Sequence, residues 1–213
     1  MSSSVVSPLD APAGVAVADS SVPHSTESTR RRLSTKQAQT VQKLVVAAVE
    51  ELREQGYDGL TVRNVARRAG VAPATAYNYF TSREHLVTEV FWRRLQGLPE
   101  TRVDMRRTAA GRAVATMTDL ALLVADEPEL ASACTVAMLS NDPDVKLLRD
   151  RIGVEWHRRL AHALGDPADP AVLGTLEFAM SGAMVQAGMG HMTYEELPAK
   201  LAKAVQLVVP DGR

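Results

Sequence analysis

The residues best suited to chemistry lie in one short polar stretch of the chain. Ala74 and Thr75 are small enough to let a backbone come close to a partner, and Asn78 can donate and accept hydrogen bonds at a base edge. Tyr77 and Tyr79 each carry a hydroxyl on a rigid ring, which suits a contact to phosphate. The same two tyrosines could instead pack in a core, which is the usual use of an aromatic ring.

No comparable arrangement predicts catalysis. The spacings HExxH, GxSxG and that of a P-loop are absent. The histidines are scattered, at His24, His85, His157, His162 and His191. A single cysteine, Cys134, excludes an intrachain disulfide, a multi-cysteine zinc site and an iron–sulfur cluster held by this chain alone. We therefore expect no enzyme, no cofactor and no metal site.

The charge is unevenly distributed along the 213 residues, although the net charge is only −1. Residues 30–94 hold 12 basic and 6 acidic side chains, whereas residues 95–213 hold 12 basic and 16 acidic ones. A locally positive module is what a nucleic-acid-binding domain needs to displace counterions from phosphates. The alternative is a chance asymmetry on a solvated surface.

The termini and the hydropathy favour a globular cytoplasmic protein that does not contact a membrane. No apolar run approaches the roughly 18–20 residues that span a bilayer, and the N-terminus does not resemble a secretory signal. Residues 1–29 contain eight Ser and three Pro and no Lys or Arg, which predicts a disordered tail over residues 1–33. The run Arg30–Arg32 ends this tail, either as a solvated linker or as an arm that contacts DNA.

Helical periodicity follows this tail and predicts four helices over residues 34–97. The first has apolar residues from Val41 to Leu52 at helical spacing and stops near Gly56. Thr61 caps a short second helix, Gly70 permits a tight turn, and a third short helix runs from Pro73 to about Tyr79. A capping box formed by Thr81 and Glu84 is expected to open the fourth helix. Two short helices joined by a glycine turn predict a helix-turn-helix, whose second helix enters the major groove.

The stretch from Leu60 to Leu86 resembles the DNA-binding signature of the tetracycline-repressor (TetR, or AcrR-like) family. The family pattern is T-x-R-x-[VI]-A-x-x-A-G-V, then T-x-Y-x-[YH]-F, then [ST]-[KR]-[ED]-x-L. The chain matches at Thr61, Arg63, Val65, Ala66, Ala69, Gly70, Val71, Thr75, Tyr77, Tyr79, Phe80, Ser82, Arg83, Glu84 and Leu86. The resemblance covers about residues 35–90.

By position, the resemblance implies a DNA-contacting role for nine residues. Thr61 and Val62 would contact the DNA backbone, and Arg63 would reach a base edge. The start of the recognition helix would face the groove through Pro73, Ala74 and Thr75. Asn78 joins these candidates from its side-chain chemistry and not from the resemblance. Phosphate contacts are implied for Tyr77, Tyr79 and Arg83. Ala72 stands where the family often has Ser, so one hydroxyl contact is lost.

Residues 98–213 show helical patterns and no convincing strand, so we expect an all-α fold with a larger C-terminal effector-binding and dimerisation domain. The helix predicted at 170–190 is apolar on most sides and contains several glycines. One monomer could cover it. The resemblance implies instead that it forms a homodimer interface with the last helix, whose apolar stripe is Leu201, Val205 and Val208.

Methionines and small residues in this domain suit an adaptable apolar pocket, although ordinary core packing is the alternative for any single one. The side chains expected to line an effector pocket are Met117, Cys134, Met138, Trp156, Phe178 and Met184. Few aromatics and no evident buried basic cluster favour a flexible, mostly apolar effector such as an acyl chain.

Together these features predict a ligand-responsive repressor that binds a palindromic double-stranded operator as a dimer and is released by its effector. The two recognition helices would lie roughly 34–36 Å apart, one DNA turn. The alternative is an architectural or partner-binding DNA protein of the same fold without an effector. A filled C-terminal core without a cavity would favour that alternative.

Overall fold

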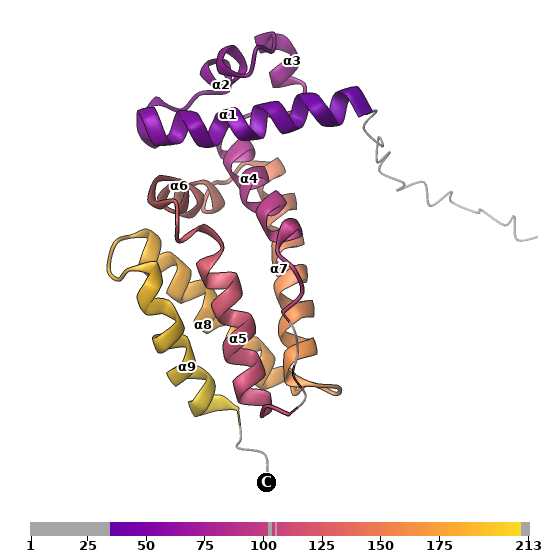
Figure 1. The fold of residues 1–213 in the computed structure, drawn as a ribbon, viewed down its shortest axis with the longest axis vertical. Helices are drawn as coiled ribbons and strands as arrows, with labels where there is room; N and C mark the ends of the chain where they lie inside the picture. The colour runs from indigo at the N-terminus through magenta and orange to yellow at the C-terminus, as the bar shows by residue number, and fades with distance from the viewer. Residues whose placement is uncertain (1–34, 102–103, 105, 210–213) are drawn as a thin grey trace, which may run out of the picture. The chain divides into compact units, whose positions relative to one another are not determined.

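Helices dominate the part of the chain that the computed structural model describes, residues 35–101, 104 and 106–209 (Figure 1). The α-helices are α1 (Thr35–Gly59), α2 (Val62–Arg68), α3 (Pro73–Tyr77), α4 (Arg83–Gly97), α5 (Ala109–Ala121), α6 (Pro128–Met138), α7 (Pro143–Leu164), α8 (Pro170–Gly188) and α9 (Leu197–Val208). Two short 3₁₀ turns are η1 (Leu122–Val124) and η2 (Tyr194–Glu196). No strand occurs among these residues, which confirms the all-α prediction. The predicted tail and basic arm at 1–33 lie outside the described residues.

Local signals in the sequence set the boundaries of the first helices. Gly56 has φ +65°, so α1 is interrupted there before its last turn. The Thr61 hydroxyl accepts a hydrogen bond from the Asn64 amide at 3.0 Å and caps α2. Gly70, also at φ +65°, makes the turn into α3, and Pro73 occupies the first turn of that helix.

The predicted cap of α4 is wrong by one residue. Ser82, not Thr81, is the N-cap, and its hydroxyl accepts from the His85 amide at 3.0 Å. The Thr81 hydroxyl donates instead to Asp144 at the start of α7, at 2.8 Å. A long-range contact has therefore replaced the local one that the spacing suggested.

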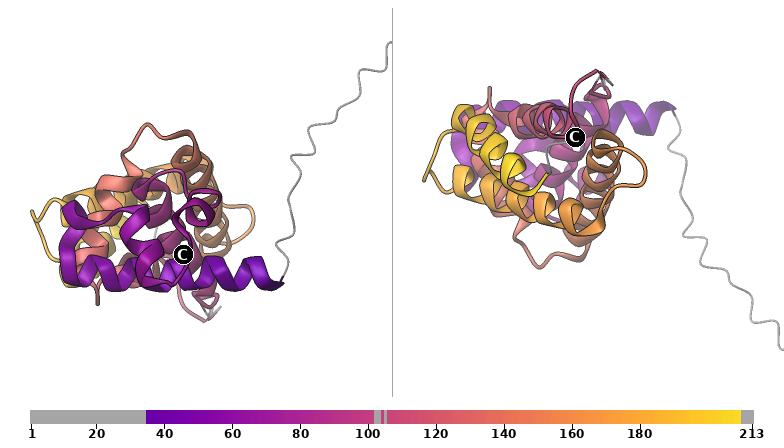
Figure 2. Two further views of the ribbon diagram at one scale, coloured as in Figure 1. Left: turned by 90° about the horizontal axis from the view of Figure 1, so that it is seen from above. Right: turned by 90° about the horizontal axis from the view of Figure 1, so that it is seen from below.

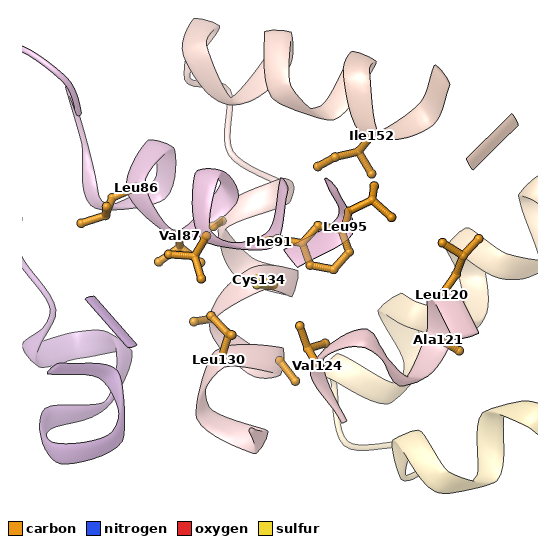
Figure 3. Close-up of a cluster of buried hydrophobic side chains, with 14 of the residues drawn as sticks. Leu86, Val87, Phe91, Leu95, Leu120, Ala121, Val124, Leu130, Cys134 and Ile152 are labelled. Atoms are coloured by element: carbon orange, nitrogen blue, oxygen red, sulfur yellow. The ribbon is translucent and has the colours of Figure 1, made fainter. Parts of the chain in front are cut away.

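Helix α4 lies within a continuous buried core (Figure 3). Leu86, Val87, Phe91 and Leu95 line its buried side, and it packs against α1, α6 and α7. Apolar residues of α5, η1, α6 and α7 belong to the same cluster. The boundary predicted between residues 97 and 98 therefore crosses a shared core, and a division into two domains remains a prediction.

Helices α5, α7, α8 and α9 pack side by side and form a ring (Figure 2). α5 and α8 each contact both α7 and α9. Leu201 and Val205 of α9 and Leu176 of α8 are fully or almost fully buried within this ring, and Val208 is partly buried. The central residues of the α9 stripe therefore pack against their own chain, and the pairing of α8 and α9 with a second subunit stays a prediction. The described helices include none that is both long and apolar enough to cross a membrane.

Candidate nucleic-acid interface and effector cavity

Helix α2 presents Thr61 and Arg63 to solvent and buries Val62, which is 4% exposed. The side chain of Val62 therefore belongs to the core, and only its backbone is left for the DNA contact that the family resemblance implies. Arg68 holds α2 against α1, because its Nε donates to buried Glu51 at 2.6 Å and its Nη1 donates to Glu54 at 2.8 Å. These bonds orient the face of α2 that carries Arg63.

Helix α3 is anchored by buried Ala76, which leaves most of its remaining side chains outside. Pro73, Ala74 and Asn78 are exposed and Thr75 is half-buried. The two tyrosines differ. Tyr77 is 49% exposed, whereas Tyr79 packs partly against the core. Tyr77 is thus exposed enough for the predicted phosphate contact, which stays a prediction, while Tyr79 is partly buried against the core.

Arg83, the third residue implied to contact phosphate, already has partners in the chain. Its guanidinium lies over the Tyr57 ring at 4.4 Å from the centroid, its Nη1 donates to the Tyr57 carbonyl at 3.1 Å, and its Nε donates to Glu84 at 3.0 Å. The Tyr57 hydroxyl donates to the same Glu84 oxygen at 3.0 Å, and burial together with this bond raises the pKa of Tyr57 to about 12. These contacts hold Arg83 against Tyr57 of α1, and the charge that it offers to a phosphate is partly offset by Glu84.

The start of α4 is tied to the start of α7 by polar contacts. The Ser82 hydroxyl donates to Asp142, and this hydrogen bond is the main reason that the Asp142 pKa is lowered. Thr81 donates to Asp144, whose carboxylate also lies 3.6 Å from His85 Nδ1. Because α3 ends only a few residues before Thr81, these contacts join the recognition helix to α7.

The end of α4 is tied to α7 by Arg159, whose side chain is only 5% exposed. Its two terminal nitrogens donate to the carbonyls of Pro99 at 3.0 Å and Leu98 at 2.9 Å, and its Nε donates to Glu155 at 2.7 Å. A cation at a helix C-terminus satisfies carbonyls that have no partner within the helix. Helix α4 is therefore fastened to α7 at both ends.

A cavity of about 220 Å³ is lined by residues of α4, α6, α7 and α8 and by Leu139 after α6. Four of the six predicted effector residues line it: Cys134, Met138, Trp156 and Met184. Met117 does not, because it is fully buried in the core from α5. Phe178 does not either, because it projects from the outer side of α8 and is 83% exposed.

Eight further lining residues were not predicted: Phe91, Thr135, Leu139, Arg149, Ile152, Gly153, Ser181 and Val185. The α7 members share one helical face with Trp156, a spacing that the sequence contained. The lining is mostly apolar, and burial raises the pKa of the Cys134 thiol to about 12, so the thiol stays protonated near neutral pH. Arg149 donates from Nη1 to the Met138 carbonyl and is exposed at the rim. The cavity suits an apolar ligand with a polar end near Arg149.

The fold and the exposed faces of α2 and α3 define a helix-turn-helix regulator. A family model described as bacterial regulatory proteins, tetR family, matches residues 44–90. HTH-type transcriptional regulators of Mycobacterium tuberculosis and Mycobacterium bovis are each 45% identical over 88% of this chain and 87% of their own length. The chain belongs to the tetR family of bacterial transcriptional regulators, and membership implies that it binds DNA and dimerises.

Solved structures show the same fold. A TetR transcriptional regulator from Rhodococcus sp. RHA1 aligns with a TM-score of 0.67 at 20% identity, over 83% of this chain and 98% of that one. The regulator FadR from Bacillus subtilis, in complex with stearoyl-CoA, aligns with a TM-score of 0.61 at 19% identity, over 81% and 99%. The transcriptional repressor KstR of Rhodococcus jostii is 29% identical over 52% of this chain and 53% of its own length.

Proposed function

We propose that this protein is a repressor that leaves its operator when a mostly apolar effector enters the cavity between α4, α6, α7 and α8. The cavity is the observation that carries the proposal, since an architectural protein of this fold would have a filled core. Phe91 places α4 itself in the cavity wall. A ligand in this cavity therefore touches the helix that follows the recognition helix.

The coupling between cavity and DNA runs through α7. Arg149, Ile152, Gly153 and Trp156 line the cavity between the two points where α7 is fastened to α4. A ligand that displaces this segment of α7 also displaces α4. The reason is that Asp142 binds Ser82 at the start of α4, and Arg159 binds the carbonyls that follow the end of α4. The recognition helices of a dimer then lose the spacing that matches one DNA turn, about 34–36 Å.

The cavity volume limits the size of the effector that can enter without a movement of the protein. About 220 Å³ is less than the roughly 300–1,000 Å³ of cavities that hold drug-sized ligands. A long acyl chain enters only if the methionine side chains and helices move apart, and such a movement is what the release of DNA requires. The binding of stearoyl-CoA by the Bacillus subtilis FadR, which has this fold, supports an acyl compound as the first class to test.

At the operator, Arg63 and Asn78 read base edges, and Tyr77 and Arg83 position the protein on phosphates. Two copies bind a palindromic double-stranded site. The fold's dimerisation supports this arrangement, since a twofold protein matches a twofold operator.

The test is a screen of acyl-CoAs, free fatty acids, planar aromatics and sugars, each added alone. An effector raises the melting temperature, because it binds only the folded state, and lowers operator occupancy in an anisotropy assay. Release by an acyl compound supports the proposal. Release only by a planar aromatic or a sugar contradicts the effector class, and thermal stabilisation without release by any compound contradicts the coupling.

A further inference from the structure

Arg149 of α7 places a positive charge where the effector cavity opens to solvent. Arg149 and Leu139 both line the cavity and are both exposed, Leu139 by 66%. The other described residues of the lining are uncharged near neutral pH. Lys146 on the same helix is paired with Asp150 at 2.8 Å, whereas the hydrogen bonds of Arg149 within the described chain go to carbonyls. An anion at the cavity mouth therefore meets a guanidinium that no carboxylate of the described chain neutralises.

The hydrogen bonds of Arg149 close the C-terminal end of α6. Its Nη1 donates to the Met138 carbonyl at 2.5 Å and to the Ser140 carbonyl at 3.4 Å. The last carbonyls of a helix have no donor within the helix, and together they carry only about half an elementary negative charge. A carboxylate or a phosphate carries a full charge and can accept two parallel hydrogen bonds from one guanidinium. Such a group can therefore displace the two carbonyls as the partner of Arg149.

Ser140 and Asp142 connect these carbonyls to the start of α4. The Ser140 hydroxyl accepts from the Asp142 amide at 3.1 Å. One oxygen of the Asp142 carboxylate caps α7 by accepting from the Asp144 amide at 2.8 Å. The other oxygen accepts from the hydroxyl of Ser82, the N-cap of α4. A short chain of hydrogen bonds thus leads from Arg149 at the cavity mouth to the helix that follows the recognition helix.

We propose that the effector carries a carboxylate or a phosphate at its polar end and that Arg149 binds this anion. The inference rests on the function proposed above and adds the trigger for release. When the anion takes Arg149 from its two carbonyls, the corner between α6 and α7 (residues 139–142) loosens and Asp142 no longer holds Ser82. A neutral ligand of the same length fills the cavity but leaves this corner closed.

The first experiment compares Arg149→Met with Arg151→Met in the absence of any ligand. Both residues are exposed on α7 and both variants remove one positive charge, but only Arg149 lines the cavity and caps α6. Arg149→Met should raise hydrogen exchange at the amides of Asp142 and Asp144. It should also weaken operator binding at least about threefold more than Arg151→Met does, because one lost charge-assisted hydrogen bond is worth at least that factor. Equal effects of the two variants in either measurement would overturn the proposal.

The second experiment compares four ten-carbon probes that differ in their polar ends: decanoate, decan-1-ol, decylammonium and decanoyl-CoA. Operator release is measured by anisotropy. Decanoate should act at an about three- to tenfold lower concentration than decan-1-ol, as a charge-assisted bond to an exposed arginine allows. Decylammonium should be the weakest, because Arg149 repels it. Release by decanoate identifies the anion as a carboxylate, and release by decanoyl-CoA without release by decanoate identifies it as a phosphate.

Substitution of Arg149 then shows whether the preference for an anion comes from this residue. Arg149→Met should remove the preference for the anionic probe over decan-1-ol, and Arg149→Lys, which keeps the charge without the planar fork, should retain part of it. If decan-1-ol or decylammonium is as effective as the anionic probes, or if the preference survives in Arg149→Met, the inference is overturned and the proposed apolar effector stands. Release by none of the four probes counts against the proposed function, and the comparison without ligand then decides the inference alone.

Discussion

Helices α3 and α8 both carry an outward-facing aromatic ring, but their surroundings are determined in different ways. Tyr77 of α3 is 49% exposed, and the caps, the glycine turn and the proline that set its direction lie within a few residues of it. Phe178 of α8 is 83% exposed, and the packing of α6, α7 and α9 decides which side of this apolar helix is covered. The DNA-facing region is thus built from local signals, and the effector region from long-range contacts.

The DNA-facing region and the effector region are connected through α4. The largest effect is therefore expected from removing one of the contacts that hold α4 to α7. Arg159→Ala removes a buried cation and leaves the carbonyls of Leu98 and Pro99 without their donor, while the Glu155 carboxylate keeps Arg158 as its partner. Because a buried acceptor left unpaired costs about 1–3 kcal/mol, we expect the free energy of unfolding, measured by urea denaturation, to fall by about 2–4 kcal/mol.

Arg158→Ala is the matched control. Arg158 also binds Glu155, but it is 49% exposed, so its loss should cost no more than about 1 kcal/mol. Equal effects of the two variants would show that Arg159 does not fasten α4.

The variant Arg63→Ala tests the predicted base contact in the DNA-facing region. If Arg63 reads a base edge, its removal costs about 1–3 kcal/mol at one position of each half-site and relaxes the preference there. Selection from a randomised operator library measures this preference. Unchanged discrimination at every position would remove Arg63 from the set of base-reading residues.

Substitutions of Tyr77 and Tyr79 should affect different properties: DNA affinity for Tyr77 and thermal stability for Tyr79. Tyr77→Phe should weaken binding to all sequences by about 0.5–1.5 kcal/mol without changing stability, because it removes one exposed hydroxyl. Tyr79→Ala should lower the melting temperature more than Tyr77→Ala, since only Tyr79 packs against the core. A base preference altered by Tyr77→Phe would contradict its phosphate role.

The smallest expected effect is the pH dependence of the stability that the Ser82–Asp142 hydrogen bond contributes. The hydrogen bond from Ser82 lowers the folded-state pKa of Asp142, so its contribution is fully present above the ordinary pKa of about 3.9 and is lost as the pH falls through the lower folded value. Because the carboxylate is partly exposed, we expect less than about 1 kcal/mol. Urea unfolding of the wild type and Asp142→Asn between pH 3 and 6 should converge at the acidic end, and a constant difference would contradict this assignment.

The sequence predicted most of α1–α4 because capping and turn residues act on their neighbours. Thr61, Gly70 and Pro73 each occupy the place expected of them. Ser82 was missed because Thr81 had equally suitable spacing, and only the contact with Asp144 in α7 distinguishes the two.

The cavity was predicted in part. Cys134, Met138, Trp156 and Met184 were found from composition, yet Met117 and Phe178 have the same chemistry and lie elsewhere. Composition cannot tell the inner side of a helix from its outer side when both are apolar. For α8 that distinction comes from the neighbouring helices, which also explains why the sequence did not show that the centre of the α9 stripe is buried within its own chain.

The central claim is that occupancy of the cavity controls operator binding. Its most direct test uses the compound that most raises the melting temperature, with operator affinity measured by anisotropy for the wild type and for Met184→Trp, which fills the cavity. The compound should lower wild-type affinity by about 5–150-fold, the usual range of coupling between two sites, and should leave Met184→Trp unchanged. Full operator affinity in the wild type with the compound bound, or equal release of both proteins, would contradict the account.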